Sequence, residues 1–430
     1  MLKPSRRSFL AAGATLPAAS ALAKMQPGQE ERVAADLARY IGFGSKQAGG
    51  TGDNAAGEWL IAELEQLGFK VERQSVPTPF FETQRAELLC GDARAAVWPQ
   101  PIVMTTGPDG ATGPLVCIDV NGQAAGPLPG ALALIELPHG RWSSALAKPI
   151  REPINAAFAA GAKAVVAITN GPTGKVIALN ADGREPMFAG PVALLAPDDA
   201  KPFRAAAITR QPATLHLQGQ TGRRPAFNFI GRIDRGRKRW LAVSTPRSGW
   251  YICAGERGPG IAAWLWLARW ASETVKDHDL AFVCHSGHEY ENLGASEALK
   301  AIAPKPAETR FWLHLGANVA ARDWHELLGK LRPLPSVDTQ RFLSVSPDLL
   351  PVAREVFAGH AGLEAAWTTD EITAGELTEI VGAGYAPAAG VFGIHRYHHV
   401  AEDDARCVSA ASVAATAAAF QCLVETQIRG

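Results

Sequence analysis

Three histidines near the C-terminus are the residues whose type and spacing are best suited to chemistry. His395, His398 and His399 stand in one short segment. Imidazole is a common metal ligand, and it is a general base near neutral pH because its pKa lies close to 7. The segment therefore predicts a metal-binding loop. The alternative is a histidine-rich loop that binds no metal.

Two nucleophilic arrangements are weak. Cys284 and His288 have Cys-x-x-x-His spacing, but no local signature of a thiol enzyme surrounds them. The chain also lacks Gly-x-Ser-x-Gly, and Ser286-Gly287-His288 does not match the sharp turn on which α/β-hydrolases carry their serine. The sequence argues against both nucleophiles.

An aromatic pair and an arginine suggest a binding pocket. Trp250 and Tyr251 lie just before the turn that contains Glu256. We predict that they line a pocket for an apolar or aromatic group. Arg247 lies close by, and we predict that it pairs with a carboxylate of a peptide or another acidic ligand, since guanidinium binds carboxylates well.

Alternating short strands and helices must position these residues. Apolar strands are predicted at 240–243, 280–284 and 311–315, a tryptophan-rich helix at 261–271, and a closing alanine-rich helix at 410–423. Trp264, Trp266 and Trp270 are predicted to pack that helix against its neighbours. This alternation is typical of an α/β fold in which helices cover both faces of a mostly parallel sheet.

The first half of the chain predicts two further parts. Residues 30–67 read as helix, interrupted by a glycine-rich loop at 44–53, and a strand follows Gly68. In residues 88–216, short strands alternate with Gly/Pro turns, and one helix is predicted at 154–160. We therefore predict a main domain of residues 24–87 and 217–430, and a small inserted β-rich module of residues 88–216.

The N-terminus predicts export. Ser5-Arg6-Arg7-Ser8-Phe9-Leu10 precedes a short apolar stretch that ends in Ala21-Leu22-Ala23. A basic start, a short apolar region and a small-x-small site are typical of a twin-arginine signal peptide, here residues 1–23, and predict a periplasmic or secreted protein. The alternative is a disordered basic N-terminus with an alanine-rich helix.

Composition restricts the partners. Lys plus Arg and Asp plus Glu both number 42, so the zero net charge argues against a broad nucleic-acid surface. No other apolar run is long enough for a membrane span, so the mature chain is predicted to have none. The six cysteines contain no Cys-x-x-Cys pair and predict no disulfide scaffold. A small peptide or another small molecule is the expected substrate or ligand, and the oligomeric state stays open.

Five segments in order resemble the zinc exopeptidases of the bacterial leucyl aminopeptidase and glutamate carboxypeptidase type. They are the helix–loop–helix around Gly50-Thr51-Gly52, the run Gly161-Ala162-Lys163-Ala164-Val165 of a protease-associated insert, the strand Phe227-Asn228-Phe229-Ile230-Gly231, the turn His288-Glu289, and His399-Val400-Ala401-Glu402-Asp403. The resemblance covers most of the mature chain. It implies a zinc-aminopeptidase-like fold, two zinc ions and hydrolysis of amide bonds.

The resemblance assigns roles to residues of this chain. Glu256 falls at the bridging carboxylate, Glu289 at the glutamate ligand and His399 at the late histidine ligand. His314 falls near the second aspartate, and His288 stands in place of the general base. The first histidine ligand is missing, because the chain has Thr245-Pro246-Arg247 there.

Two interpretations follow from these departures. The first is an exported hydrolase with one zinc ion held by Glu256, Glu289 and His399, and with His288 as base. The second is an inactive relative that binds a ligand or a partner. Alternatives also stay open for single residues: Glu256 beside Arg257 as a salt-bridged turn, and His314 as a buried core histidine.

Overall fold

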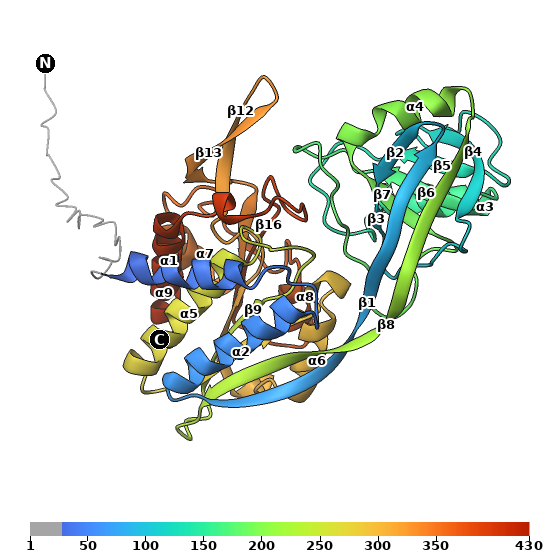
Figure 1. Cartoon of the computed structure of the whole chain (residues 1–430). Coiled ribbons are helices and arrows are strands. Elements are labelled where there is room, and N and C mark those ends of the chain that lie inside the picture. Colours follow the sequence, from blue (N-terminus) through green and yellow to red (C-terminus); the bar gives the residue numbers. More distant parts are fainter. Residues whose placement is uncertain (1–27, 430) are drawn as a thin grey trace, which may run out of the picture.

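The computed structural model describes residues 28–429, which form two lobes (Figure 1). The predicted signal peptide, residues 1–23, lies outside the described residues. The helices are α1 (Gln29–Gly42), α2 (Thr51–Gln66), α3 (Lys148–Ala159), α4 (Lys201–Ile208), α5 (Gly258–Thr274), α6 (Leu293–Ala301), α7 (Leu350–Val356), α8 (Glu376–Gly382) and α9 (Ala410–Arg429). The strands are β1 (Lys70–Cys90), β2 (Ala93–Ala96), β3 (Trp98–Pro99), β4 (Ala111–Ile118), β5 (Leu132–Glu136), β6 (Ala164–Ile168), β7 (Val192–Leu195), β8 (Pro212–Ile233), β9 (Trp240–Pro246), β10 (Asp279–His285), β11 (Thr309–Leu315), β12 (Arg322–Leu327), β13 (Lys330–Val337), β14 (Arg341–Val345), β15 (Trp367–Thr368) and β16 (Ala388–Gly393).

A mixed sheet with a parallel centre forms the main lobe. Strand β9 pairs in parallel with β10 and β11, and β11 pairs in parallel with β16. Strands β8 and β14 join this centre antiparallel. Every residue of β9 and β10 is buried, as expected where helices cover both faces. The predicted α/β class is confirmed.

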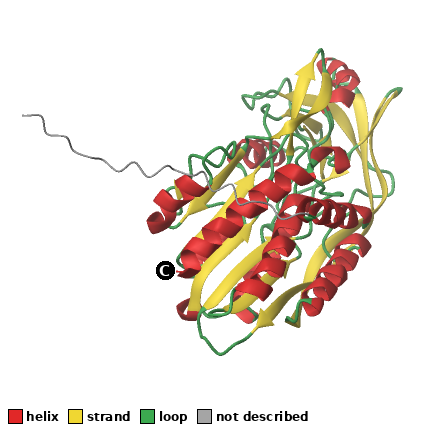
Figure 2. Ribbon diagram, turned by 90° about the vertical axis from the view of Figure 1, so that its left-hand side faces the viewer, coloured by secondary structure: helices red, strands yellow, loops and turns green. Residues whose placement is uncertain are grey.

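Alternate residues of the central strands face two different cores. Leu241 and Val243 pack with α1, α2, α5 and α9, whereas Trp240 and Ala242 pack with α6 and α8. This is the period-two pattern of a strand buried on both faces. Figure 2 shows the helices lying along the sheet.

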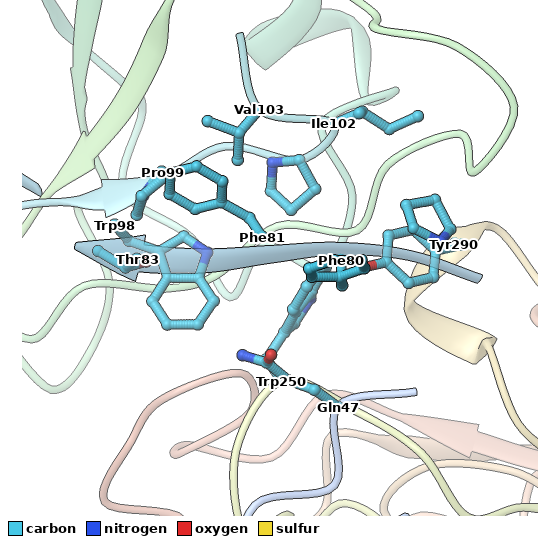
Figure 3. Close-up of a pocket in the computed structure, with 12 residues that line it drawn as sticks. Gln47, Phe80, Phe81, Thr83, Trp98, Pro99, Ile102, Val103, Trp250 and Tyr290 are labelled. Atoms are coloured by element: carbon cyan, nitrogen blue, oxygen red, sulfur yellow. The ribbon is translucent and has the colours of Figure 1, made fainter. Parts of the chain in front are cut away.

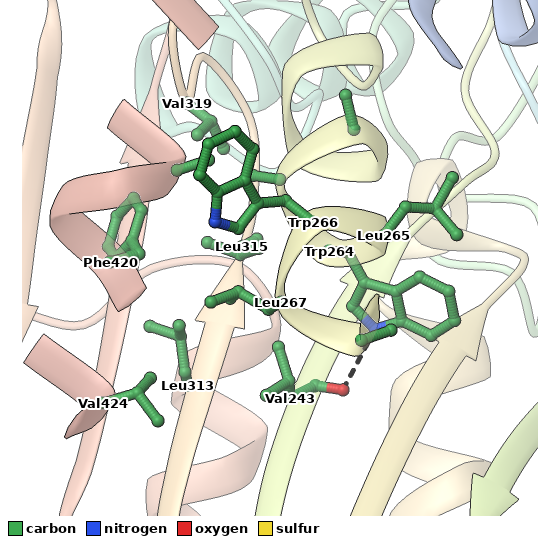
Figure 4. Packing of buried hydrophobic residues seen from close by; sticks show 14 of the residues in the cluster. Val243, Trp264, Leu265, Trp266, Leu267, Leu313, Leu315, Val319, Phe420 and Val424 are labelled. Carbon is green, nitrogen blue, oxygen red and sulfur yellow. Dashed lines mark hydrogen bonds between the residues drawn. The ribbon is translucent and has the colours of Figure 1, made fainter. Parts of the chain in front are cut away.

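Helix α5 is central to the larger core. Trp264 is fully buried and donates a hydrogen bond to the Val243 carbonyl, 3.1 Å away, while Trp266 lies between α5 and α9 (Figure 4). Burying such a side chain contributes on the order of 2–3 kcal/mol. The predicted packing role of the tryptophans is confirmed, and the closing helix extends beyond its predicted end, to Arg429.

The glycine-rich loop is shorter than predicted, because α2 already begins at Thr51. Gly52 makes this possible. A Cβ atom there would lie 2.1 Å from the Ser45 carbonyl oxygen, so only glycine lets the helix start pack this closely against the loop.

Two long antiparallel strands, β1 and β8, connect the main lobe to the second lobe (Figure 1). Residues 91–211 between them form the module. Its strands β4, β5, β6 and β7 pair in parallel, and α3 and α4 pack on them. The module has more helix than predicted, since α4 was not predicted and α3 begins before the predicted residue 154. Its likeness to a protease-associated insert stays a prediction.

The two lobes share a core. Trp324, Tyr397 and Val400 of the main lobe pack in one buried cluster with Leu137 and Leu179 of the module. No helix among residues 28–429 is both long enough and apolar enough to cross a membrane. All six cysteines are free thiols.

Candidate functional site

The predicted site residues lie in loops that follow the parallel strands. Glu256 follows β9, Glu289 follows β10, His314 is near the end of β11, and His399 follows β16. Because the carboxyl ends of parallel strands meet at one edge of a sheet, ligands bind at this edge in open α/β folds. The fold therefore brings the predicted residues to the expected edge.

Glu256 and His399 meet there, and Arg257 joins them. The Nε2 atom of His399 lies 3.3 Å from Oε1 of Glu256, and Nη2 of Arg257 lies 2.7 Å from the same oxygen. Glu256, Arg257 and His399 are each about 1% exposed. Burial alone would raise the pKa of Glu256, but Arg257 and the histidines outweigh it and hold the pKa well below its usual value. Glu256 is within ion-pair distance of Arg257, as the salt-bridged alternative expects, although its Oε1 accepts no hydrogen bond; its use as a metal ligand stays a prediction.

Asp403 fixes the turn that presents Glu256. Its carboxylate accepts hydrogen bonds from the backbone N–H of Gly255 at 2.6 Å and of Glu256 at 3.0 Å. His395 Nε2 lies 3.4 Å from the same carboxylate. The histidines of this segment therefore lie in two places. His395 faces Asp403, whereas His398 and His399 lie near the Glu256 carboxylate.

His398 stacks on His399. Their ring centroids are 3.9 Å apart and their planes differ by 17°. Burial and the neighbouring His399 lower the pKa of His398 well below its usual value, so this imidazole is neutral. Imidazole lone pairs lie in the ring plane, so those of two stacked, nearly parallel rings do not converge on one ion.

Glu289 does not join Glu256 and His399, contrary to the prediction. Its Oε1 accepts a hydrogen bond from the Ala48 N–H at 2.7 Å, and its Oε2 accepts one from the Ser248 hydroxyl at 2.6 Å. Burial raises the pKa of Glu289, although these hydrogen bonds act to lower it. Both oxygens are used by the protein, and Glu289 is held between the loop after α1 and the loop after β9.

Glu376 organises a second cluster that the sequence did not reveal. Its Oε1 lies 2.7 Å from Nδ1 of His288, and its Oε2 lies 3.2 Å from Nε2 of His314. Burial alone would raise the pKa of Glu376, but the two histidines outweigh it and lower the pKa well below its usual value. Glu376 begins the short helix α8, in a stretch with no motif that would have singled it out.

His314 is buried in the core, where only one of its two ring nitrogens has a hydrogen bond. Its Nδ1 lies 2.9 Å from the Ser244 hydroxyl, which also accepts a hydrogen bond from the Trp312 indole at 2.8 Å. His314 is fully buried and faces Glu376, not Glu256. This arrangement agrees with the core-histidine alternative. His288 is likewise held by Glu376, on the other carboxylate oxygen.

Arg247 does not face a ligand, and the predicted substrate role is wrong. Its Nε lies 3.0 Å from Oδ1 of Asp53, and its Nη2 donates a hydrogen bond to the Phe227 carbonyl at 2.7 Å. Arg247 and Asp53 are both fully buried. The carboxylate that pairs with Arg247 therefore belongs to the protein itself, not to a ligand.

Trp250 lines a hollow where the two lobes meet (Figure 3). Trp98, Phe80 and Tyr290 also line it. Tyr251 does not line this hollow; its ring lies 4.9 Å from that of Trp98, which does. An aromatic hollow at Trp250 agrees with the predicted pocket, and its use by a substrate stays a prediction.

The module covers the buried cluster. The Ala178 carbonyl lies 2.8 Å from Nδ1 of His399, and the Ala178 N–H donates to the His399 carbonyl at 2.9 Å. The Ala181 N–H donates to the Glu289 carbonyl at 3.1 Å. Trp250 donates to the Asn180 side chain at 3.0 Å. Residues 178–181 thus contact the loops at the edge of the sheet that carry Glu289 and His399.

Among residues 28–429, two groups of side chains have ligand atoms close enough for an ion: Glu256 with His398 and His399, and His395 with Asp403 and Cys407. Neither is a good zinc site. In the first, Nη2 of Arg257 lies 2.7 Å from Oε1 of Glu256 without a hydrogen bond, and the imidazoles are stacked. In the second, Asp403 already accepts two backbone hydrogen bonds, and burial raises the pKa of the Cys407 thiol far above its usual value.

The residues also do not fit the zinc pair that the resemblance implies. Thr245 stands at the first histidine position and donates its hydroxyl to the Leu315 carbonyl at 2.8 Å. A neutral hydroxyl already used in a hydrogen bond is a poor substitute for imidazole. This chain therefore has the sheet edge that the resemblance implies, but different side chains stand where the zinc ligands would be.

Known structures share this architecture. The zinc aminopeptidase BSAP of Bacillus subtilis matches with a TM-score of 0.72 and 16% identity, over 94% of this chain and 96% of that chain. A peptidase M28 precursor of Shewanella amazonensis SB2B matches with a TM-score of 0.71 and 17% identity, over 93% and 92%. The aminopeptidase of Aneurinibacillus sp. strain AM-1 matches with a TM-score of 0.63 and 16% identity, over 93% and 95%.

These likenesses define the fold class: the chain has the zinc-aminopeptidase fold, as the sequence predicted. No protein-family model and no curated protein sequence matches it. At this level of identity the likeness extends to the fold, and function has to be argued from the site.

Proposed function

We propose that this protein uses the zinc-aminopeptidase fold to bind a ligand and does not hydrolyse peptides with zinc. The observation that carries this proposal is the 2.7 Å contact between Arg257 and Glu256. Glu256 stands where the resemblance places the carboxylate that bridges two ions. Unit charges 4 Å apart repel by about 4 kcal/mol at an effective dielectric constant of 20, and a divalent ion doubles this. A guanidinium beside the carboxylate therefore opposes metal binding.

Access to the cluster supports the same conclusion. Catalytic zinc sites keep one position open for water or substrate. Here Glu256, Glu289 and Glu376 are each at most about 1% exposed, and residues 178–181 of the module lie over the cluster. A peptide would need a rearrangement of the module before it reached these side chains.

We also propose that the protein is exported. Residues 1–23 are proposed to direct the folded chain through the twin-arginine pathway, so the protein would act in the periplasm or outside the cell. Its ligand is proposed to be a peptide or another small molecule, and the module to be a protease-associated insert that shapes the binding surface.

Metal content and activity test the proposal together. The mature chain is purified without added zinc, its metal is measured by elemental analysis, and aminoacyl p-nitroanilides are assayed with and without zinc. We expect well under one zinc per chain and no release of nitroaniline. One zinc per chain with activity that disappears in Glu256→Gln would overturn the proposal.

One observation favours a second candidate, a hydrolase with a single zinc ion. His399 Nδ1 contacts the Ala178 carbonyl, so in an uncharged His399 the proton lies on Nδ1. The Nε2 lone pair would then point at Glu256. Two acceptors 3.3 Å apart repel unless a proton or a cation lies between them. In this interpretation Glu256 and His399 hold the ion, Glu289 turns toward it and His288 serves as base.

Zinc titration separates the two candidates. The single-zinc hydrolase requires that one equivalent of zinc raises the melting temperature, and that Glu256→Gln and His399→Gln each remove the rise. Trp367→Ala changes an exposed side chain on an edge strand and is the control, which should leave any zinc effect unchanged. No rise in the parent chain excludes this candidate.

A further inference from the structure

The hairpin of β12 and β13 projects from the main lobe and is not part of its large sheet (Figure 1). A two-stranded ribbon is only marginally stable alone, so it needs packing against the rest of the protein. Trp324 of β12 is 4% exposed, and its ring centroid lies 4.6 Å from that of Tyr397. Leu331 of β13 packs against the same buried cluster as Trp324. These contacts hold the hairpin up to the residues beside its turn.

The turn of this hairpin exposes two leucines. Leu327 is 63% exposed and Leu328 is 92% exposed, and they are adjacent where the chain passes from β12 to β13. Single exposed apolar residues are normal on a protein surface, whereas exposed apolar residues that lie together mark contact sites. Leu328 is almost fully in water, so its side chain contributes little to the core.

The backbone at Leu328 is also unusual for a leucine. Its φ is 52°, and Gly329 follows with a φ of 69°. Positive φ at both central residues is the pattern of a type I′ hairpin turn, in which Asn or Asp usually precedes Gly. Bulky side chains rarely adopt this conformation. Leu328 therefore costs the fold backbone strain without adding burial, which indicates a contact outside the chain.

Two cations accompany the leucines. Lys330 and Arg332 are exposed, and neither side chain forms a hydrogen bond or an ion pair within residues 28–429. The neighbouring Glu326 is already paired, because its carboxylate lies 2.7 Å from Nη1 of Arg396. The hairpin tip, residues 327–332, therefore combines exposed apolar side chains with unpaired positive charge.

This combination favours a lipid surface over a protein partner. Specific protein interfaces bury about 800 Å² on each partner, far more than two leucines of a turn can cover. Addition of a partner strand is also disfavoured, because Pro333 and Pro335 remove N–H donors from β13. A bilayer needs no matched surface for apolar side chains, and anionic headgroups attract Lys and Arg beside them.

We propose that the hairpin tip docks this protein on bilayers that contain anionic phospholipid. Leu327 and Leu328 enter the interface between headgroups and acyl chains, and Lys330 and Arg332 contact the headgroups. Such binding is peripheral and reversible. It is separate from the ligand binding proposed above, so either proposal can fail without the other.

Vesicle binding by the mature chain tests the proposal. Vesicles of phosphatidylglycerol and phosphatidylcholine in equal parts are compared with vesicles of phosphatidylcholine alone, by co-sedimentation at low salt. We expect about 25-fold tighter binding to the anionic vesicles, since each cation near such a surface contributes about fivefold. This preference should decrease as salt is added. Equal binding to both vesicles, or no binding to the anionic ones, would overturn the proposal.

Variants of the tip locate the contact. In Leu328→Asn the melting temperature should stay the same or rise, because asparagine tolerates positive φ, whereas vesicle binding should fall at least about tenfold. Lys330→Gln should weaken binding to anionic vesicles about fivefold. Val120→Asn removes another exposed aliphatic side chain, from the module, and is the matched control that should leave binding unchanged.

Two results would refute the site. One is vesicle binding that survives Leu328→Asn. The other is a parent chain that ignores vesicles but forms an oligomer in light scattering, with Leu328→Asn reducing its mass, because the tip would then be a contact between proteins.

Discussion

At Glu256 a guanidinium stands beside the carboxylate that the resemblance assigns to metal. Arg257 donates its Nε to the Ser248 carbonyl at 3.1 Å and directs its Nη2 at Glu256. Burial opposes its charge, but Glu256 and then Glu376 outweigh burial and raise its pKa. One internal cation therefore interacts with Glu256 and Glu376 and partly replaces the charge that metal ions would bring.

Removing this cation should create affinity for zinc. In Arg257→Ala we expect a loss of about 3–5 kcal/mol in the free energy of unfolding, because Glu256 is left buried without its partner. Zinc should restore part of that stability in urea denaturation, whereas it should not stabilise the parent chain. Arg257→Lys keeps the positive charge and is the control that should stay insensitive to zinc. An Arg257→Ala chain that zinc does not stabilise would contradict this account of the site.

At the scale of elements, the strands place titratable groups where water does not reach. His285 ends β10, is 2% exposed, and stacks near His314 with ring centroids 6.3 Å apart. Burial lowers the pKa of His285 to about 3. The folded chain therefore holds this histidine neutral at pH values where an unfolded chain would protonate it.

This histidine predicts a loss of stability in mild acid. The unfolded state binds more protons between pH 6.5 and about 3, so the free energy of unfolding falls as the pH is lowered through that window. From about pH 6.5 to 5 the loss attributable to His285 is about 2 kcal/mol. Urea midpoints of the parent chain and His285→Gln at the two pH values measure it. A variant with the same pH dependence as the parent would show that His285 is not the cause.

Helix α5 gives a second prediction at this scale. Trp264→Ala should lower the free energy of unfolding by about 3–5 kcal/mol, because it leaves a cavity against β9 and loses the bond to the Val243 carbonyl. Trp367→Ala removes a half-exposed tryptophan from an edge strand and should cost much less. Chemical denaturation compares the two variants, and similar losses would contradict the central place of α5 in the core.

At the scale of the whole molecule, the module and the main lobe are joined in three ways. The β1–β8 pair connects them covalently and by backbone hydrogen bonds, Trp324 and Tyr397 pack into the module core, and Arg141 pairs with Asp338 across the junction. The same junction covers the Glu256 cluster with residues 178–181.

A shared core predicts cooperative unfolding. We expect one calorimetric transition for the mature chain, because one buried cluster is built from residues of both lobes. Tyr397→Ala weakens the contact and should lower the melting temperature, or divide the transition into two. Two separate transitions in the parent chain would show that the module folds independently of the junction.

Local pattern was sufficient for much of the architecture. The buried strands 240–246 and 279–285, the tryptophan helix and the closing helix follow from hydrophobic periodicity, which is carried by neighbouring residues. Helix α3 was predicted only from residue 154, because its two prolines obscure its first turns. The resemblance also placed Glu256 and His399 correctly at one edge of the sheet.

The tertiary structure alone decided which charges meet. The residues next to Arg247 in the sequence do not show whether its side chain faces a ligand or the core. Only the folded chain shows that Asp53 lies beside it. Glu376 carries no motif, yet it joins His288 to His314. The sequence by itself determined the α/β order and the candidate edge, because periodicity is local. Ion pairs such as Arg247–Asp53 depend on side-chain directions and on distances of about 3 Å between distant segments, which only the folded chain shows. For Glu256, the sequence left Arg257 and Glu289 open as neighbours, and the fold places Arg257 beside it.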